Sequence, residues 1–279
     1  MIKVRRITSF DLPELQPYRT MRRQEQHREQ GIFVAEGEKV VRRLLESKLQ
    51  VLSVLLPEKW LVLLEAQLKL RPEDIEVFVA DKALLETLTG FSMYQGLLAV
   101  GKVPAPVSLS DLLARSNQPY LLAAVDSLSS AENLGAVVRN CAALGVHGLI
   151  VGETCSSPFL RRAVRSSMGT AFLLPMIETE SLTRALSELR ARGVRCIAAH
   201  PREPQRIVAQ VAFTGDCCVV FGSEGYGISP DILAACDEAA AIPMTPEVDS
   251  LNVGCAAAVF LYEAVRQRRM PSYFLNTAR

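Results

Sequence analysis

Short apolar runs alternate with amphipathic segments along the first part of the chain. Four of these runs predict strands, at 32–35, 51–56, 75–80 and 96–103. Between them, apolar residues recur at i, i+3 and i+4, the spacing of one helix face, at 37–48 and 59–70. The pattern predicts a small α/β domain over residues 1–103.

Further along, the apolar runs lose their polar alternation, as in strands buried on both faces. The predicted strands are 120–126, 147–152, 171–177, 194–200, 217–222 and 238–244. The predicted helices are 133–145, 181–193 and 250–269. We expect an open, doubly wound α/β domain over 111–279, a parallel sheet with helices on both faces. A segment with two prolines and two serines predicts a linker at 104–110.

Composition narrows the class of protein. Hydrophobic residues make up 49% of the 279 residues, which is enough for a sizeable core. The seven cysteines form no C-x-x-C pair, and their odd number fits buried thiols in a reducing cytoplasm. His27, His147 and His200 lack the spacing of metal ligands, so no metal is expected. Neither a secretory signal nor a membrane span is visible, so we expect a soluble cytoplasmic protein.

The first two loops that could carry chemistry follow predicted strands. After 120–126, Asn133 is placed to cap a helix, and Arg139 lies about two turns along it. Arg139 could equally be a solvated helix arginine. The second loop, FGSEGYGIS at 221–229, has three glycines that permit sharp turns, although a plain tight turn explains them too. It is neither a P-loop nor G-x-G-x-x-G, and its Glu224 could orient Arg139 or a substrate hydroxyl.

The third loop, TPEVD, joins the strand that ends in IPM to a long helix that opens with SLNV. Ser250 and Asn252 are expected at the helix N-terminus, where unpaired N–H groups and partial positive charge gather. The alternative for Ser250 is a simple N-cap.

These three loops, in this order, resemble the motifs of the SpoU (TrmH-like) family of RNA 2′-O-ribose methyltransferases, of the SPOUT class, over residues 118–270. The residues that match are Asn133, Gly135 and Arg139; Gly222, Glu224, Gly225 and Gly227; and Ile242, Pro243, Met244, Ser250, Leu251, Asn252 and Val253. Ser130 and Ala131 stand where the family usually has Asp-Pro, and Pro246 where it often has Gly. We expect these departures to change loop stiffness and to leave activity intact.

The resemblance implies a fold and a cofactor. Members form a C-terminal trefoil knot, which sequence physics alone would not suggest. They bind S-adenosylmethionine in the knot and are typically homodimers. The implied cofactor-binding residues are Gly222, Glu224, Gly227, Ile242, Met244, Leu251 and Asn252. The implied catalytic residues are Arg139, Asn133, Glu224, Ser250 and Asn252. A guanidinium is essentially never deprotonated, so we expect Arg139 to hold a substrate phosphate and stabilise oxyanion charge.

The expected partner is RNA, although the formal net charge is only +1. GIFVAEGEKVVRRLL and YQGLLAV resemble the start and the Gln-Gly-containing end of a substrate-binding domain that many members carry, which makes 1–103 the expected RNA-binding domain. The candidate RNA contacts are Arg19, Arg22, Arg23 and Arg28 on one predicted helix, Gln95, and the second basic cluster Arg161, Arg162 and Arg165. Basic clusters of this kind usually contact phosphate, but solvated helix faces are the alternative.

The sequence leaves three candidate functions. The first is 2′-O-ribose methylation of ribosomal RNA, with transfer RNA as the alternative substrate; ribosomal RNA is favoured by family analogy. The second is a non-catalytic RNA-binding or ribosome-assembly protein, against which the retained Arg139, Glu224, Ser250 and Asn252 argue. The third is an oxidoreductase with an open α/β site, which would require a glycine fingerprint that is missing here.

Overall fold

The computed structural model describes residues 1–89, 96–201 and 206–268, and the chain divides into two compact units. The N-terminal unit comprises Met1–Ala105 together with Pro158–Leu173. The C-terminal unit comprises Pro106–Ser157 together with Leu174–Arg279. A stretch from the middle of the chain therefore packs with the N-terminal unit. No helix in the described part of the chain is long and apolar enough to cross a membrane.

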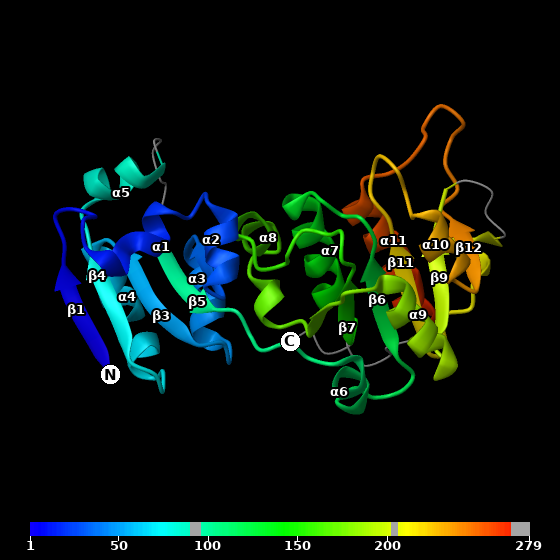
Figure 1. Ribbon diagram of the computed structural model, residues 1–279, viewed down its shortest axis with the longest axis horizontal. Helices are drawn as coiled ribbons and strands as arrows, with labels where there is room; N and C mark the ends of the chain where they lie inside the picture. The colour runs from blue at the N-terminus through cyan, green and yellow to red at the C-terminus, as the bar shows by residue number, and fades with distance from the viewer. Residues whose placement is uncertain (90–95, 202–205, 269–279) are drawn as a thin grey trace, which may run out of the picture. The chain divides into compact units, whose positions relative to one another are not determined.

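The N-terminal unit is built on a mixed five-stranded sheet of order β1-β4-β3-β5-β2. Strands β1, β4 and β3 are parallel, whereas β5 runs antiparallel to both β3 and β2. Figure 1 shows β1, β4 and β3 side by side. The strands are β1 (Ile2–Arg6), β2 (Ile32–Glu36), β3 (Val51–Leu56), β4 (Ile75–Val79) and β5 (Leu98–Lys102). The helices are η1 (Pro13–Leu15), α1 (Gln16–Arg19), α2 (Gln24–Glu29), α3 (Glu38–Glu46), α4 (Glu58–Lys69), α5 (Lys82–Thr89), α8 (Arg161–Ser166) and η2 (Thr170–Phe172).

Aromatic packing draws the later segment Pro158–Leu173 into this unit. The ring of Phe33 lies 5.5 Å from that of Phe159 and 5.2 Å from that of Phe172, centroid to centroid. A Cβ at Gly101, in the neighbouring strand, would come within 2.4 Å of the Phe33 ring, so this position in β5 requires glycine. The carboxylate of Glu36 accepts hydrogen bonds from Arg161 and, at 3.0 Å, from Arg165, which holds α8 against β2.

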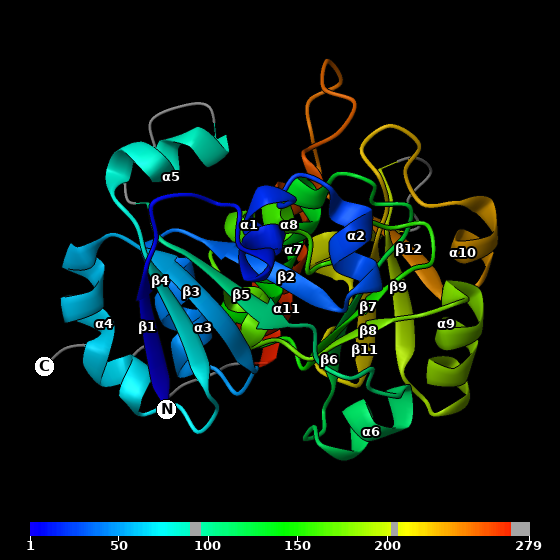
Figure 2. The ribbon, with the colours of Figure 1, turned by 60° about the vertical axis from the view of Figure 1, so that its left-hand side comes forward.

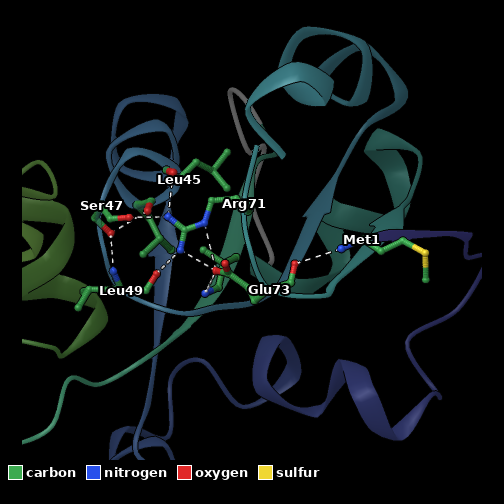
Figure 3. A network of polar contacts seen from close by, with 8 residues as sticks. Met1, Leu45, Ser47, Leu49, Arg71 and Glu73 are labelled. Atoms are coloured by element: carbon green, nitrogen blue, oxygen red, sulfur yellow. Dashed lines mark hydrogen bonds and ion pairs between the residues drawn. The ribbon is translucent and has the colours of Figure 1, made fainter. Parts of the chain in front are cut away.

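A nearly buried arginine organises the turn that leads from α3 into β3 (Figure 3). The guanidinium of Arg71 donates to three backbone carbonyls and pairs with Glu73 at 2.6 Å; the carbonyls are those of Leu45, Ser47 and Leu49. Burial alone would raise the pKa of the Glu73 carboxyl. Hydrogen bonds from Arg71 and from the Val51 N–H outweigh burial, and the pKa lies below its ordinary value. The pair therefore ties the connection between α3 and β3 to the segment that precedes β4.

The C-terminal unit contains a wholly parallel seven-stranded sheet of order β10-β12-β9-β11-β6-β7-β8. Strands β6, β7 and β11 are buried along their whole length, as the unbroken apolar runs predict. The strands are β6 (Leu121–Val125), β7 (Gly148–Val151), β8 (Met176–Glu178), β9 (Arg195–Ala199), β10 (Arg206–Ile207), β11 (Cys217–Phe221) and β12 (Glu238–Ala241).

Helices cover both faces of this sheet, which confirms the predicted α/β architecture. Leucines of α6 (Leu109–Ala114) and α9 (Leu182–Ala191), with Ile232 of α10 (Pro230–Ala234), form one core with β6, β9 and β11. On the other face, α7 (Ala131–Ala143) packs against α11 (Val253–Arg268). Figure 2 shows α9 and α10 on one side of β9 and β11, and α7 and α11 on the other. A short 3-10 helix, η3 (Val208–Gln210), follows β10.

Several predicted elements are wrong in detail. The strand predicted at 171–177 is the end of η2 followed by the three-residue strand β8, because Pro175 interrupts the run and has no N–H to donate. The four arginines of the first basic cluster do not share one helix, since α1 ends at Arg19 and α2 begins at Gln24. Strand β1 was not predicted. The trefoil knot and the domain limits 1–103 and 111–279 stay predictions.

Replacing Arg71 by Ala should lower the free energy of unfolding of the N-terminal unit by about 3 kcal/mol, because a nearly buried carboxylate and three carbonyls lose their partner. The single tryptophan, Trp60, is 7% exposed and lies in this unit, so its fluorescence during urea unfolding reports the change. The control is Lys69→Ala, which removes a side chain that is 60% exposed and paired only across one helix turn. It should cost about 0.5 kcal/mol. Equal losses in the two variants would contradict the role assigned to Arg71.

Candidate active site

The three motif loops of the C-terminal unit start at one edge of the parallel sheet. Strand β11 pairs in parallel with β6 on one side and with β9 on the other, and β9 pairs with β12. The loops after all four strands therefore begin at the same edge, where open α/β sheets bind ligands. The order of strands reverses between β6 and β11, since β7 and β8 lie to one side and β9 and β12 to the other.

A buried aspartate ties the first loop to the second. Asp126, only 5% exposed, follows β6 directly. Its carboxylate accepts a hydrogen bond from the Ser229 N–H at 2.7 Å and another from the Ser127 hydroxyl at 3.0 Å. Its own N–H donates to the Phe221 carbonyl at 2.8 Å. Sequence reasoning missed Asp126, although an acidic residue at the end of a buried strand is the signal that could have found it.

The glycine-rich loop is a closed hairpin. Ser223 and Gly227 exchange two backbone hydrogen bonds of 2.9 Å each, and Gly227 has a φ of 72°. A Cβ at Gly222 would lie 2.2 Å from the Gly227 carbonyl carbon and 2.3 Å from the Ile228 nitrogen. The loop therefore is a tight turn, and its glycines allow the two arms to touch.

One side chain joins all three motifs. The amide of Asn252 donates from Nδ2 to Asn133 Oδ1 at 3.1 Å and also to Glu224 Oε1. Its Oδ1 accepts the Gly254 N–H at 2.9 Å, so the orientation of the amide is set by the backbone. Glu224, which was expected to orient Arg139 or a substrate hydroxyl, thus bonds to Asn252, and residues of all three motifs meet here.

The helix caps differ from those predicted. Helix α11 begins at Val253, and Asn252 is its cap, because its side chain accepts the N–H two residues on. Ser250 lies before the cap, so both the predicted start at 250 and the N-cap alternative for Ser250 are wrong. Helix α7 begins at Ala131, where Ser130 caps it by accepting the Asn133 N–H at 3.2 Å. Ser130, one of the departures from the family pattern, is therefore the cap of α7, a role that was expected of Asn133.

Arg139 lies exposed on α7. Within the part of the chain that the structure describes, its side chain forms no hydrogen bond or ion pair. A guanidinium without a protein partner is available to an anionic ligand.

A cavity of about 360 Å³ opens beside the hydrogen-bonded motifs. Most of the predicted cofactor-binding residues line it, along with Ser250: Gly222, Glu224, Gly227, Ile242, Met244 and Leu251. Asn252, Asn133 and Arg139 do not line it, although Asn252 bonds to Glu224, which does. Residues that the sequence did not predict also line it, namely His200 and Pro201 after β9, Tyr226, Asp249 and Phe260. His200, Pro201 and Phe260 lie outside the motifs, whereas Tyr226 and Asp249 stand directly beside motif residues, a signal that could have found them.

The cavity fits S-adenosylmethionine in size and chemistry. Its volume lies within the range of about 300–1,000 Å³ that is usual for small-molecule sites. Ala241, Ile242 and Phe260 supply an apolar wall for an adenine ring. Glu224 and Asp249 supply carboxylates, which suit a cofactor that carries positive charge on its sulfonium and amino groups.

The arginines among the predicted RNA contacts lie in the N-terminal unit. Arg19, Arg22, Arg23 and Arg28 are all exposed, on α1, on α2 and on the turn between them. In the second cluster, Arg161 and Arg165 share the carboxylate of Glu36, whereas Arg162 is exposed. Gln95 lies outside the described residues. RNA binding by these side chains stays a prediction.

Comparison with known proteins identifies relatives over nearly the whole chain. The model of the SpoU rRNA methylase family matches residues 120–262. A tRNA/rRNA methyltransferase of Mycobacterium leprae is 32% identical over 86% of this chain and 72% of its own length. A tRNA/rRNA methyltransferase of Mycobacterium tuberculosis is 31% identical over 95% of this chain and 93% of its own length. The chain spans less than two thirds of some other relatives, 61% in the case of a second protein of Mycobacterium tuberculosis.

Solved structures agree in fold. The SpoU methyltransferase AviRb from Streptomyces viridochromogenes, in complex with the cofactor AdoMet, has a TM-score of 0.79 and 26% identity, and the match covers 92% of this chain and 99% of that one. A structure described as an RNA 2′-O ribose methyltransferase has a TM-score of 0.78 over 95% of this chain and 99% of its own, at 24% identity, a likeness that shows the fold alone.

Replacing Gly222 by Ala should weaken the binding of S-adenosylmethionine by about tenfold or more, because the new Cβ must push the two arms of the hairpin apart; tenfold corresponds to about 1.4 kcal/mol. Gly225→Ala is the matched control in the same loop, since a Cβ there meets nothing within 4 Å. Isothermal titration of both variants with the cofactor measures the difference. Unchanged affinity in Gly222→Ala would show that the closed hairpin does not shape the pocket.

Proposed function

Because the chain belongs to the SpoU rRNA methylase family of RNA methyltransferases, we propose that it transfers the methyl group of S-adenosylmethionine to a ribose 2′-hydroxyl of RNA. One observation carries the proposal: Asn252 joins Glu224 to Asn133 beside a cavity of the right size and chemistry. The three motifs on which the resemblance rests therefore form one hydrogen-bonded group.

S-adenosylmethionine supplies an electrophilic methyl group, which a nucleophilic oxygen displaces directly. Such a displacement needs the oxygen aligned behind the methyl carbon, and positioning of this kind contributes much of the rate in enzymes. The rigid edge of the cavity suits that task, since Asp126 and the Ser223–Gly227 hairpin fix the loops on either side of it.

The polar groups at the edge of the cavity match a ribose. A carboxylate only accepts hydrogen bonds, and Glu224 uses Oε1 for Asn252. In this proposal its second oxygen accepts the hydrogen bond of a substrate hydroxyl and orients that hydroxyl for attack. Asn133 receives the Asn252 bond on its Oδ1, which turns its own Nδ2 donors toward other acceptors, such as a ribose oxygen.

Arg139 supplies positive charge for the RNA. A guanidinium binds phosphate oxygens with two parallel hydrogen bonds and stabilises charge that develops on the attacking oxygen. It cannot serve as the base, because it stays protonated in proteins. Its side chain is exposed and does not line the cofactor cavity. Arg139 therefore acts on the RNA.

Ribosomal RNA is the substrate that we favour, with transfer RNA as the alternative. The relatives bear names that include both classes. The N-terminal unit, with its exposed arginines, offers a second surface for phosphate contacts over a large RNA. A cytoplasmic homodimer formed through the methyltransferase domain, and knotted as the family resemblance implies, completes the proposal.

Replacing Arg139 by Ala should lower kcat by about 100-fold or more, the usual loss when one oxyanion donor is removed, and should leave the affinity for S-adenosylmethionine nearly unchanged. Arg184→Ala removes another exposed arginine, on α9, and is the matched control. Transfer of the labelled methyl group to total RNA measures turnover, and isothermal titration measures affinity.

The position of the label tests the proposed chemistry. A 2′-O-methyl group blocks alkaline cleavage of the adjacent phosphodiester, so label on ribose survives as a resistant dinucleotide. Label on a base would contradict ribose specificity. Normal turnover of Arg139→Ala would remove Arg139 from the mechanism, and absence of both cofactor binding and methyl transfer in the unaltered protein would favour the non-catalytic alternative.

A further inference from the structure

A large aromatic side chain stands in solvent at the tip of the glycine-rich hairpin. Tyr226 is 97% exposed, more than any other large apolar side chain in the described part of the chain. It lies between Gly225 and Gly227 and is one of the residues that line the cofactor cavity. Scattered exposed apolar residues are common on protein surfaces, so exposure alone does not make a site. The inference rests on the hydrogen bonds that hold the backbone under the ring and on the polar groups near it.

The backbone under Tyr226 is held in place. Ser223 and Gly227 close the hairpin with two hydrogen bonds, and the Tyr226 N–H donates to the Ser223 hydroxyl at 3.2 Å. Gly222 packs directly against Gly227 and Ile228 at the base of the hairpin. Most of the backbone ordering is therefore complete before a ligand arrives, which lowers the entropic cost of binding on the ring.

The groups near the ring correspond to the parts of a nucleotide. Glu224, two residues before Tyr226, is bonded to Asn252 and through it to Asn133, which offers acceptors and donors for a ribose. Arg139, on the helix that begins with the first motif, offers a cation for a phosphate. The third part of a nucleotide is its base, and the flat exposed face of the Tyr226 ring is a surface on which a base can stack.

We propose that Tyr226 is the platform on which a nucleobase of the substrate RNA stacks, beside the ribose that Glu224 and Asn133 contact. The inference rests on the proposed function. A base inside a helix has both faces covered by its neighbours, so only an unpaired nucleotide presents a face to the ring. The substrate class is therefore an unpaired nucleotide in a loop, bulge or single strand. Because every base has a π face, stacking of this kind tolerates all four bases.

The test compares Tyr226→Leu with Tyr226→Phe, which differ in aromatic character at similar apolar size. The probe is a single-stranded oligoribonucleotide that contains 2-aminopurine, whose fluorescence is quenched when it stacks, and the same strand in a duplex is the comparison. The unaltered protein and Tyr226→Phe should quench the single strand and bind it more tightly than the duplex. Tyr226→Leu should lose the quenching and bind the single strand about 5- to 150-fold more weakly. Its affinity for S-adenosylmethionine should fall by much less than its affinity for the single strand, because the ring contributes to the cavity but is 97% exposed.

Each other outcome overturns the inference. Equal binding of the single strand by the Leu and Phe variants would exclude stacking. A parallel loss of S-adenosylmethionine affinity in Tyr226→Leu would place the ring on the cofactor. A change of oligomeric state in that variant, measured by sedimentation, would place the ring against a second copy of the chain.

The failure of this inference can be told apart from failure of the proposed function. If Tyr226→Leu methylates total RNA as fast as the unaltered protein, at subsaturating RNA, the stacking role falls and the methyltransferase stands. If the unaltered protein transfers no methyl group to RNA, yet quenches the single strand only when residue 226 is aromatic, the proposed function falls and the stacking site stands.

Discussion

The side-chain amide of Asn252 is the contact on which the arrangement of the site depends. It bonds to Asn133, 119 residues earlier in the chain, and to Glu224, 28 residues earlier. The Gly254 N–H fixes which way the amide faces, so both bonds come from the same nitrogen. Each bond is exposed to solvent and contributes only about 1 kcal/mol to stability. Its main effect is to set the mutual position of three loops.

This junction is possible only because the backbone brings the loops close. The parallel pairing of β6 with β11 starts two of the loops at neighbouring points, and the buried carboxylate of Asp126 connects them. Helix α11 approaches α7 so closely that a Cβ at Gly254 would lie 2.9 Å from that of Ala136. The Asn140 amide then reaches the Gly254 carbonyl at 2.6 Å. Small residues thus allow the two helices to approach closely, and this approach brings the polar groups within hydrogen-bond distance.

The sequence predicts the sheet of the C-terminal unit well, because strands buried on both faces leave unbroken apolar runs. It predicts short or edge elements poorly. In β1, Ile2 and Val4 alternate with Lys3 and Arg5, a pattern too short to stand out at the end of a chain. The placement of Pro158–Leu173 in the N-terminal unit depends on the packing of Phe33 against two distant rings, which no local pattern encodes.

The same division holds within the site. Motif residues such as Gly222, Ile242 and Leu251 could be assigned to the cavity from the resemblance, and they line it. His200 could not, because it lies outside the motifs and its place in the cavity follows from strand order. Tyr226 was missed although it stands between two motif glycines, and its place follows from the closure of the hairpin. The bond between Glu224 and Asn252 was not predicted either, since each of them was assigned a role in the site without a bond to the other.

The central claim, that Glu224, Asn252 and Asn133 act as one hydrogen-bonded unit, is tested most directly by a double-mutant cycle. Asn252→Asp turns the shared donor into an acceptor that repels the Glu224 carboxylate, and adding Glu224→Gln restores a donor–acceptor pair of reversed polarity. Values of kcat/KM for methyl transfer to RNA should show a favourable coupling of about 1–3 kcal/mol, so that the double variant is faster than Asn252→Asp alone. Independent, additive losses would contradict the account.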